Sequence, residues 1–169
     1  MVNEFGIKKP IWWREILKEE HFKLAGEIAK DKVKCCHALK VVPLNDFIRD
    51  YGIDAVFVAI RWDEHEEMST EKFFSPRDNP PHMRVHPILH FRWADVWNFI
   101  KMRELKPNPL YFKGFTSLGC KPCTAPVTSG FKDVDDIIAF IRKGKVAERS
   151  GRDLDKEKVM EKLRSIGYF

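Results

Sequence analysis

The chain has 169 residues, 44% of them hydrophobic, and a formal net charge of +5. This length suits one domain of about 100–200 residues with a real core, and charges of mixed sign argue against disorder. The positive charge is too diffuse to indicate nucleic-acid binding, no apolar run approaches the roughly 20 residues of a membrane span, and the first residues lack the features of a secretory signal. We therefore expect a single cytoplasmic domain over 1–169 that binds neither nucleic acid nor a membrane.

The first half of the chain combines helical periodicity with one strand. Apolar residues recur at helical spacing over 11–31, which predicts an amphipathic packing helix. Further helical spacing ends at Gly52, and we expect Pro43 to open or kink a turn within it. The run 53–60 is nearly unbroken in apolar residues, which predicts a strand buried on both faces of a sheet. Residues 61–82 are typical of a long polar loop with proline breaks.

The second half predicts one more strand and three helices. Residues 84–90 suit a short strand, which Pro87 would place at an edge. An apolar stripe over 92–104 predicts a helix, and Asp133 is positioned to cap another. A final short helix is expected over about 154–165.

The four cysteines are candidate metal ligands. Cys35 and Cys36 are neighbours, and Cys120 and Cys123 form a C-x-x-C pair on a turn with Pro and Gly. A disulfide, a zinc site and four inert thiols are alternatives, but neighbouring cysteines strain disulfide geometry and are awkward ligands for one tetrahedral zinc ion. A [4Fe–4S] cluster offers four separate iron corners, so neighbours can each take one. We predict such a cluster, with zinc as the alternative.

Charged residues follow the predicted buried strand, where α/β proteins often bind ligands. Arg61 has a guanidinium suited to phosphate or sulfate, with Asp63, Glu64 and His65 close behind it. A solvated charged loop is an equally good interpretation. Lys113, near the C-x-x-C pair, could balance a negative ligand. We predict that Arg61, Asp63 and Lys113 bind the substrate, and we assign no catalytic residue.

Several motifs then occur in a distinctive order. They are Cys-Cys followed by Lys-Val and Pro-Leu, a strand ending in Ile-Arg-x-Asp-Glu, the run Arg-Val-His-Pro-Ile-Leu-His-Phe, and Asn-Pro-Leu-Tyr with Ser-Leu-Gly-Cys-x-Pro-Cys-Thr. Together they resemble the phosphoadenosine-phosphosulfate (PAPS) reductase family, which includes adenylyl-sulfate (APS) reductases and the small subunit of bacterial sulfate adenylyltransferase. The resemblance starts at about residue 33 and runs to the end of the chain.

The resemblance implies a fold, an activity and ligands. The fold would be a three-layer α/β, Rossmann-like adenine nucleotide alpha hydrolase fold of the PP-loop ATPase type, with residues 33–130 as the nucleotide- and cluster-binding core and 131–169 as C-terminal helices. The activity would be reductive release of sulfite from adenylyl sulfate or PAPS, with thioredoxin as a partner. Within the family, paired cysteines mark the iron–sulfur type of APS reductase. The resemblance therefore implies that Cys35, Cys36, Cys120 and Cys123 ligate a [4Fe–4S] cluster.

Three departures separate this chain from the family pattern. The glycine-rich nucleotide loop is absent, no cysteine follows Cys123 to act as the reductase nucleophile, and the paired arginines after the strand become Arg61-Trp62. The fold is therefore expected to lack its N-terminal half and to expose one sheet edge and part of its core, which predicts a homo-oligomer or a partner chain that supplies the nucleotide loop.

The C-terminal run from Glu148 to Phe169 instead resembles the end of the adenylyltransferase small subunit. Two alternative functions follow: an enzyme like the sulfate adenylyltransferase small subunit or a related sulfurtransferase, and a non-catalytic cluster-bearing subunit that completes a nucleotide-binding partner.

Overall fold

The computed structural model describes residues 13–168, which group into two compact units that we describe separately. Unit 1 contains residues 13–56, 74–85 and 159–168, and unit 2 contains residues 57–73 and 86–158. A single domain over 1–169 stays a prediction.

Unit 1 begins with two short helices, so the single helix predicted over 11–31 is wrong. Helix α1 is Trp13–Ile16 and α2 is Glu19–Ala25. Lys18 between them is extended, with φ −108° and ψ 162°, and Gly26 ends α2 at φ 67°. Residues 11 and 12 lie outside the described part of the chain.

The face of α2 that packs is not the predicted apolar stripe. His21 and Ala25 are buried, whereas Leu24 is 47% exposed. The His21 ring accepts a hydrogen bond from the Lys18 backbone N–H at 2.9 Å and lies 3.4 Å from a carboxylate oxygen of Asp46. These contacts satisfy the buried imidazole, so a polar side chain packs beside Ala25 on this helix.

The next three helical segments form one continuous rod. They are α3 (Lys32–Cys36), the π-helical turn η2 (His37–Val41) and α4 (Val42–Tyr51). The π-turn lies directly before Pro43, which has no N–H to donate to the preceding turn. The expected distortion at Pro43 is confirmed, and Gly52 ends the rod in the left-handed conformation, with φ 59°.

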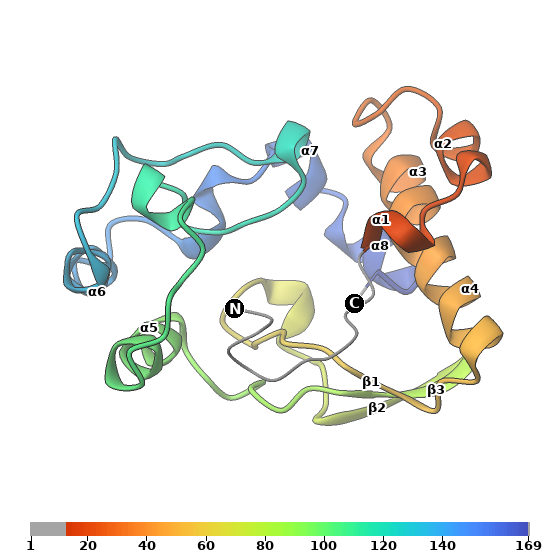
Figure 1. Ribbon diagram of the computed structural model, residues 1–169, viewed down its shortest axis with the longest axis horizontal. Helices are drawn as coiled ribbons and strands as arrows, with labels where there is room; N and C mark the ends of the chain where they lie inside the picture. The colour runs from red at the N-terminus through yellow and green to blue at the C-terminus, as the bar shows by residue number, and fades with distance from the viewer. Residues whose placement is uncertain (1–12, 169) are drawn as a thin grey trace. The chain divides into compact units, whose positions relative to one another are not determined.

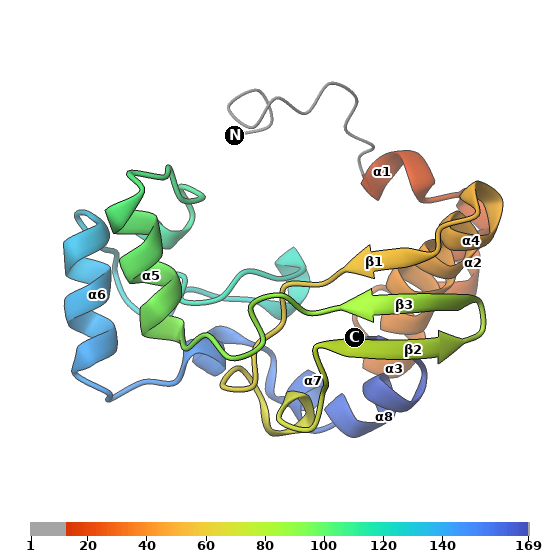
Figure 2. The same cartoon turned by 90° about the horizontal axis from the view of Figure 1, so that it is seen from below.

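A three-stranded sheet has the order β1–β3–β2. Strand β1 is Ala55–Phe57, β2 is Phe74–Asp78 and β3 is Pro81–Val85. Strands β2 and β3 form an antiparallel hairpin in which Phe74 lies opposite Val85. The arrows of β1 and β3 point the same way in Figure 2. The combination of this mixed sheet with helices confirms the α/β fold class.

The strand predictions need three corrections. The strand predicted over 53–60 has only the three residues 55–57 and forms one edge of the sheet, and it is not buried on both faces, because Ala55 and Phe57 are exposed. The polar loop predicted over 61–82 contains β2 and the start of β3. The edge strand predicted over 84–90 is misplaced in two respects. Strand β3 ends at Val85, and it is the central strand of the sheet.

Helices cover one face of this sheet. Figure 1 shows α3, α4 and α8 on one side of the strands, and Figure 2, drawn from the other side, shows the strands in front of them. The predicted helix over 154–165 is two helices, α7 (Leu154–Glu157) and α8 (Met160–Ser165). They are separated at Val159, where the chain passes from unit 2 to unit 1.

Unit 2 is built on two helices, α5 (Trp93–Met102) and α6 (Val134–Arg142). Both predicted helices are confirmed, and the Asp133 side chain caps α6 by accepting the Asp136 N–H at 2.9 Å. The hydrophobic core joins them through four buried residues, Trp97, Phe131, Ile137 and Ile138. The unit also has the short 3₁₀ helices η3 (Glu66–Met68), η4 (Tyr111–Lys113), η5 (Lys121–Cys123) and η6 (Glu148–Gly151). Within residues 13–168, no helix has the length and apolar character needed to cross a membrane.

Candidate functional site

The C-x-x-C pair lies on a tight turn in unit 2. Cys120 precedes η5 and Cys123 is its last residue, and the Cys123 N–H donates to the Cys120 carbonyl at 2.9 Å. Cys120 is exposed and Cys123 is buried, and both are free thiols. The turn therefore holds one accessible and one protected sulfur three residues apart.

The vicinal pair lies at the end of α3 in unit 1. The Cys35 sulfur is partly buried and accepts the Ala29 N–H at 3.5 Å, and Cys36 is buried. Neither forms a disulfide, so both sulfurs have the thiol chemistry that a ligand of an iron–sulfur cluster needs. Among residues 13–168, three or more His, Cys, Asp or Glu side chains do not gather in an arrangement that could hold a metal ion. The shared cluster stays a prediction.

Arg152 holds the segment that leads into the C-x-x-C turn. Its Nε and Nη2 donate to the Ser117 hydroxyl at 3.0 and 2.7 Å, and Nη2 also donates to the Leu118 carbonyl. A longer contact of 3.4 Å joins Nη1 to the Thr124 hydroxyl. One guanidinium thus binds both sides of the turn, which explains why a hydroxyl residue stands at position 117 in the Ser-Leu-Gly-Cys motif.

Two glycines make this contact possible. A Cβ on Gly119 would lie 1.6 Å from Nη1 of Arg152, and a Cβ on Gly151 would lie 2.3 Å from the Ala125 carbonyl oxygen. Both side chains would have to displace a packed group. The glycine of Ser-Leu-Gly-Cys therefore makes room for Arg152.

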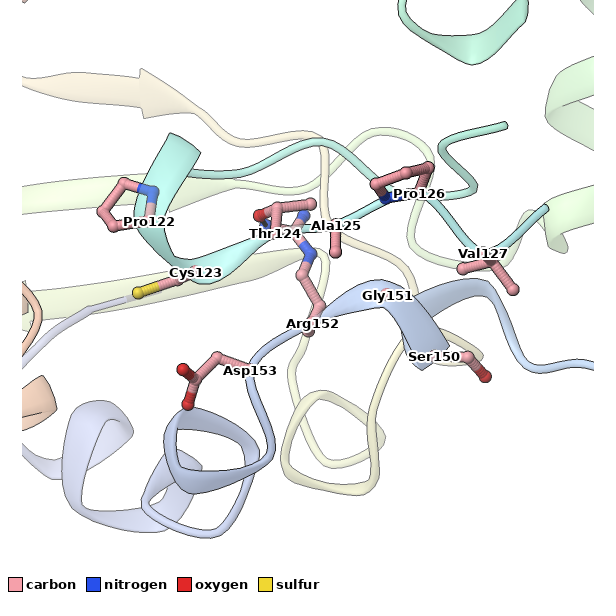
Figure 3. Close-up of a pocket in the computed structure, with 10 residues that line it drawn as sticks. All are labelled: Pro122, Cys123, Thr124, Ala125, Pro126, Val127, Ser150, Gly151, Arg152 and Asp153. Carbon is pink, nitrogen blue, oxygen red and sulfur yellow. Dashed lines mark hydrogen bonds between the residues drawn. The ribbon is translucent and has the colours of Figure 1, made fainter. Parts of the chain in front are cut away.

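The segment Gly151–Asp153 lies along Cys123–Ala125. The Ala125 N–H donates to the Gly151 carbonyl at 2.9 Å, and the Asp153 N–H donates to the Cys123 carbonyl at 3.1 Å. Figure 3 shows these two segments side by side, and both line an open groove. The groove has a volume of about 480 Å³. The groove is large enough for a small ligand or an extended peptide.

A buried charge cluster surrounds Arg61, also in unit 2. Arg61 is 5% exposed, and its guanidinium contacts Asp63 at 3.0 Å, Glu64 at 3.3 Å and Glu148. The second oxygen of Asp63 accepts the Trp93 N–H at 2.6 Å, which fixes this carboxylate at the start of α5. The predicted neighbours Arg61 and Asp63 are therefore brought together.

A second arginine extends the cluster. Arg149 binds Glu157 with two hydrogen bonds of 2.8 and 2.9 Å and lies 3.9 Å from Glu64. His65 lies 3.7 Å from Glu157. The four carboxylates outnumber the two arginines, so the cluster has an excess of acidic groups.

The electrostatic consequence is a carboxyl that keeps its proton near neutral pH. Burial raises the pKa of Glu148 to about 7, although Arg61 opposes the shift, and nearby Glu64 adds to it. Burial also raises the pKa of Glu64. Burial opposes charge on Arg61, but its three carboxylates outweigh this and raise its pKa. Glu157 is the exception, because Arg149 overcomes the effect of burial and lowers its pKa.

Helix η6 contacts both the charge cluster around Arg61 and the segment that leads into the C-x-x-C turn. The Glu148 carbonyl accepts the Thr116 hydroxyl at 2.7 Å, close to the segment that Arg152 holds. Glu148, which binds Arg61, and Arg152, which holds the segment before the C-x-x-C turn, are thus four positions apart in the chain. Lys113, the third predicted substrate ligand, is exposed at the end of η4, and its role stays a prediction.

Sequence reasoning missed the contribution of the C-terminal segment to this site. Glu148, Arg149, Arg152 and Glu157 provide most of its contacts but lie far from Arg61 and Ser117 in the sequence. A signal was available, because the run Glu-Arg-Ser-Gly-Arg-Asp combines four charges with a glycine. Nothing in the run indicates which upstream segment it contacts.

These features define an α/β protein with paired cysteines and a buried arginine–carboxylate site. Residues 6–126 match the family model described as the phosphoadenosine phosphosulfate reductase domain. The chain belongs to the phosphoadenosine phosphosulfate reductase family, as its motifs predicted.

Two curated relatives agree with this assignment. The chain is 34% identical over 116 residues to "Adenosine 5'-phosphosulfate reductase" of Geobacillus kaustophilus, covering 68% of this chain and 48% of the relative. It is 32% identical over 120 residues to "Adenosine 5'-phosphosulfate reductase 1" of Bacillus subtilis, covering 71% of this chain and 50% of the relative. The chain thus spans about half the length of the curated relatives that it matches.

Solved structures show a weaker similarity. An FMN adenylyltransferase of Candida glabrata, in complex with FAD and pyrophosphate, has a TM-score of 0.48 and 26% identity, covering 52% of this chain and 30% of that one. Yeast FAD synthetase has a TM-score of 0.48 and 22% identity, covering 64% and 53%.

Proposed function

We propose that this chain takes part in APS or PAPS reductase chemistry in sulfate assimilation, binding an adenylated sulfur compound. The observation that carries the proposal is its membership of the reductase family over residues 6–126, which include both cysteine pairs and Arg61. The relatives are named for adenosine 5'-phosphosulfate, which favours the adenylyl compound as the substrate.

The four cysteines, Cys35, Cys36, Cys120 and Cys123, would hold the [4Fe–4S] cluster. When bound, the cluster would supply a redox-active centre ligated by thiolates. Arg152 would support it indirectly, because it fixes the segment on both sides of the C-x-x-C turn.

Arg61 would bind the anionic sulfate or phosphate of the substrate. Its guanidinium is occupied by carboxylates, so an incoming anion would compete with Glu148. Because the pKa of Glu148 is about 7, this carboxyl can take up a proton when the anion arrives, which removes the repulsion between them. Asp63 would stay on Arg61 and keep the guanidinium oriented.

The reaction of the family uses a nucleophilic cysteine, and the motifs of this chain do not include it. A cysteine thiolate attacks the sulfur of adenylyl sulfate, the bond from sulfur to the AMP oxygen breaks, and AMP leaves. A second thiol, such as one from thioredoxin, then attacks the sulfur atom of the cysteine side chain. This step releases sulfite and forms a disulfide. The sequence has neither the C-terminal cysteine nor the glycine-rich loop for these steps. We therefore expect the isolated chain to bind the substrate without turning it over.

A second candidate function is a non-catalytic, cluster-bearing subunit that completes a nucleotide-binding partner. It would suit a chain that has both cysteine pairs but neither the glycine-rich loop nor a cysteine after Cys123. An enzyme like the sulfate adenylyltransferase small subunit would instead release pyrophosphate from ATP and sulfate.

Calorimetric titration with adenylyl sulfate tests the proposal. We expect binding that weakens at least tenfold in Arg61→Gln and is accompanied by proton uptake, which appears as a dependence of the heat on buffer ionisation. Lys101→Gln, which changes an exposed lysine, is the matched control and should bind normally. Absence of binding to both adenylyl sulfate and PAPS would contradict the proposed function. Sulfite release by the isolated chain would contradict the expectation that it binds the substrate without turning it over.

A further inference from the structure

The hairpin of unit 1 brings two arginines together on one face of its sheet. Ser75 on β2 lies opposite Arg84 on β3, and Arg77 lies opposite His82. These four side chains therefore point to the same side of the strands. The Arg77 side chain runs back along β2, because its Nη1 donates to the Ser75 hydroxyl at 2.6 Å. Since Ser75 lies opposite Arg84, the Arg77 guanidinium is directed toward Arg84.

The Arg84 guanidinium is held in a fixed orientation. Its Nη2 donates to the Gly167 carbonyl at 2.9 Å, and its Nε donates to Nε2 of His82 at 3.5 Å. The other ring nitrogen of His82, Nδ1, lies 2.7 Å from the Pro80 carbonyl oxygen, which can only accept, so Nδ1 carries the proton. His82 is therefore a neutral acceptor that orients Arg84 and adds no charge beside it.

Both arginines line a pocket of about 300 Å³ that we call the unit 1 pocket. Its walls come from three parts of unit 1: Asn45 from α4, Asn79 from the turn of the hairpin, and Ser165 from the end of α8. Figure 1 shows α4 and α8 on the same side of the strands. Arg84 is 2% exposed, whereas Asn79 and Ser165 are exposed, so the pocket opens at the surface and has an arginine in its depth.

The charges of the unit 1 pocket favour an anion. Arg77 and Arg84 contribute two positive charges, and the carboxylate among the described lining residues is that of the exposed Asp78. Diagonal neighbours on one face of an antiparallel pair are within reach of long side chains, and like charges close together are unfavourable. An anion between the two guanidinium groups would remove this repulsion. Guanidinium groups bind phosphate and similar oxyanions through two parallel hydrogen bonds, and the volume suits a small ligand.

We propose that the unit 1 pocket binds a tetrahedral oxyanion, sulfate or phosphate, between Arg77 and Arg84, either as the free ion or as the end group of a small ester. The Asn45 amide and the Ser165 hydroxyl line the pocket and can donate to the remaining oxygens. The unit 1 pocket shares no residue with the site around Arg61, so this proposal goes beyond the proposed function and does not depend on it.

Equilibrium dialysis of the full chain with radiolabelled sulfate, and separately with radiolabelled phosphate, tests the proposal. Sodium chloride keeps the ionic strength constant, because screening alone changes anion binding. We expect saturable binding that weakens at least tenfold in Arg77→Gln. Arg14→Gln is the matched control, since it removes the same charge at an exposed position of α1 in unit 1, and it should bind the ion normally.

A second variant separates the unit 1 pocket from the proposed substrate site. Arg61→Gln should keep the sulfate binding that Arg77→Gln loses, whereas Arg77→Gln should keep the binding of adenylyl sulfate that Arg61→Gln loses. Sulfate binding that depends on Arg77, in a protein that does not bind adenylyl sulfate, would keep the unit 1 pocket and contradict the proposed function. Adenylyl sulfate binding without any Arg77-dependent sulfate or phosphate binding would do the reverse.

Two further measurements complete the test. Circular dichroism confirms that Arg77→Gln is folded; if it is not, Arg77→Lys, which keeps the charge but loses the planar fork, should weaken binding in the same direction. Displacement of labelled phosphate by glycerol phosphate identifies the source, because an ester that competes better than inorganic phosphate is the favoured ligand and one that competes worse assigns the free ion. The proposal is overturned if neither ion binds saturably, or if Arg77→Gln and Arg14→Gln bind equally.

Discussion

Unit 1 and unit 2 deal with buried polar groups and with apolar surface in different ways. Unit 2 has two aromatic residues in its core, Trp97 and Phe131, and joins its buried Arg61 to three carboxylates. Unit 1 buries His21, His82 and Arg84 and leaves Phe74 exposed on its sheet. Unit 1 also buries apolar residues such as Ile48, Met160 and Leu163, so the two units differ mainly in the partners of their buried polar groups.

This difference predicts that substitutions in the two units change the free energy of unfolding to different extents. The charge cluster around Arg61 is paired within unit 2, so the stability of this unit should respond strongly to changes at its core and charge cluster. Unit 1 has the exposed Phe74 on its sheet, and changes there should affect stability little. The predictions below test that division, from the largest expected effect to the smallest.

Trp97→Ala should have the largest effect. The indole packs edge-on against Tyr111, with ring centroids 5.0 Å apart, and lies in the core between α5 and α6. Removing a buried aromatic side chain leaves a cavity and costs about 3–5 kcal/mol. Urea unfolding measures this loss. A loss below about 1 kcal/mol would show that unit 2 does not depend on this core.

Arg61→Met should lower the free energy of unfolding by about 2–3 kcal/mol. Removing the guanidinium leaves Asp63, Glu64 and Glu148 without their shared partner, and breaking a buried ion pair costs about 3–5 kcal/mol, reduced here because Asp63 is partly exposed. The control is Lys101→Met, which breaks the exposed pair with Asp135 and should cost less than about 1 kcal/mol. Equal losses in the two variants would contradict a cooperative cluster.

Glu148 should make stability depend on pH. Its pKa is raised in the folded chain from 4.5 to about 7, so its contribution is fully present below about pH 4.5 and is lost as the pH rises through 7. The free energy of unfolding of wild type minus that of Glu148→Gln should therefore fall by about 2 kcal/mol between pH 4.5 and 8. A difference that stays constant over this range would reject the raised pKa.

Phe74→Ser should have the smallest effect on stability, within about 0.5 kcal/mol, because the side chain is 66% exposed in the isolated chain. Thermal unfolding of the isolated protein provides the measurement. A loss above about 2 kcal/mol would mean that Phe74 is part of a core of unit 1, which would contradict the difference between the two units.

The sequence predicted the elements whose signals are local. Asp133 caps α6, Gly52 ends α4 and Pro43 adjoins a π-turn, because capping and proline effects depend on a few neighbouring residues. The order of motifs also predicted the family. Periodicity failed for α2, where His21 is buried through a contact with Asp46 that lies 25 residues away.

Non-local contacts set the limit of prediction for the sheet and the site. The apolar run 53–60 predicted a strand buried on both faces, but such burial requires a layer packed on each face, and Ala55 and Phe57 of β1 are exposed. The role of Arg61 was predicted from its place after a strand, whereas Glu148, 87 positions later in the chain, became visible only in the structure. Local patterns cannot identify a partner so distant in sequence.

The most direct test of the proposed role is the iron and acid-labile sulfide content of protein purified without oxygen. The account predicts about four of each per chain, and their loss in both Cys36→Ser and Cys120→Ser, because each removes one thiolate ligand. Ser165→Ala, which changes an exposed hydroxyl at the end of α8, should keep the cluster. Iron-free protein in which all four thiols react freely, or one zinc ion per chain, would contradict it.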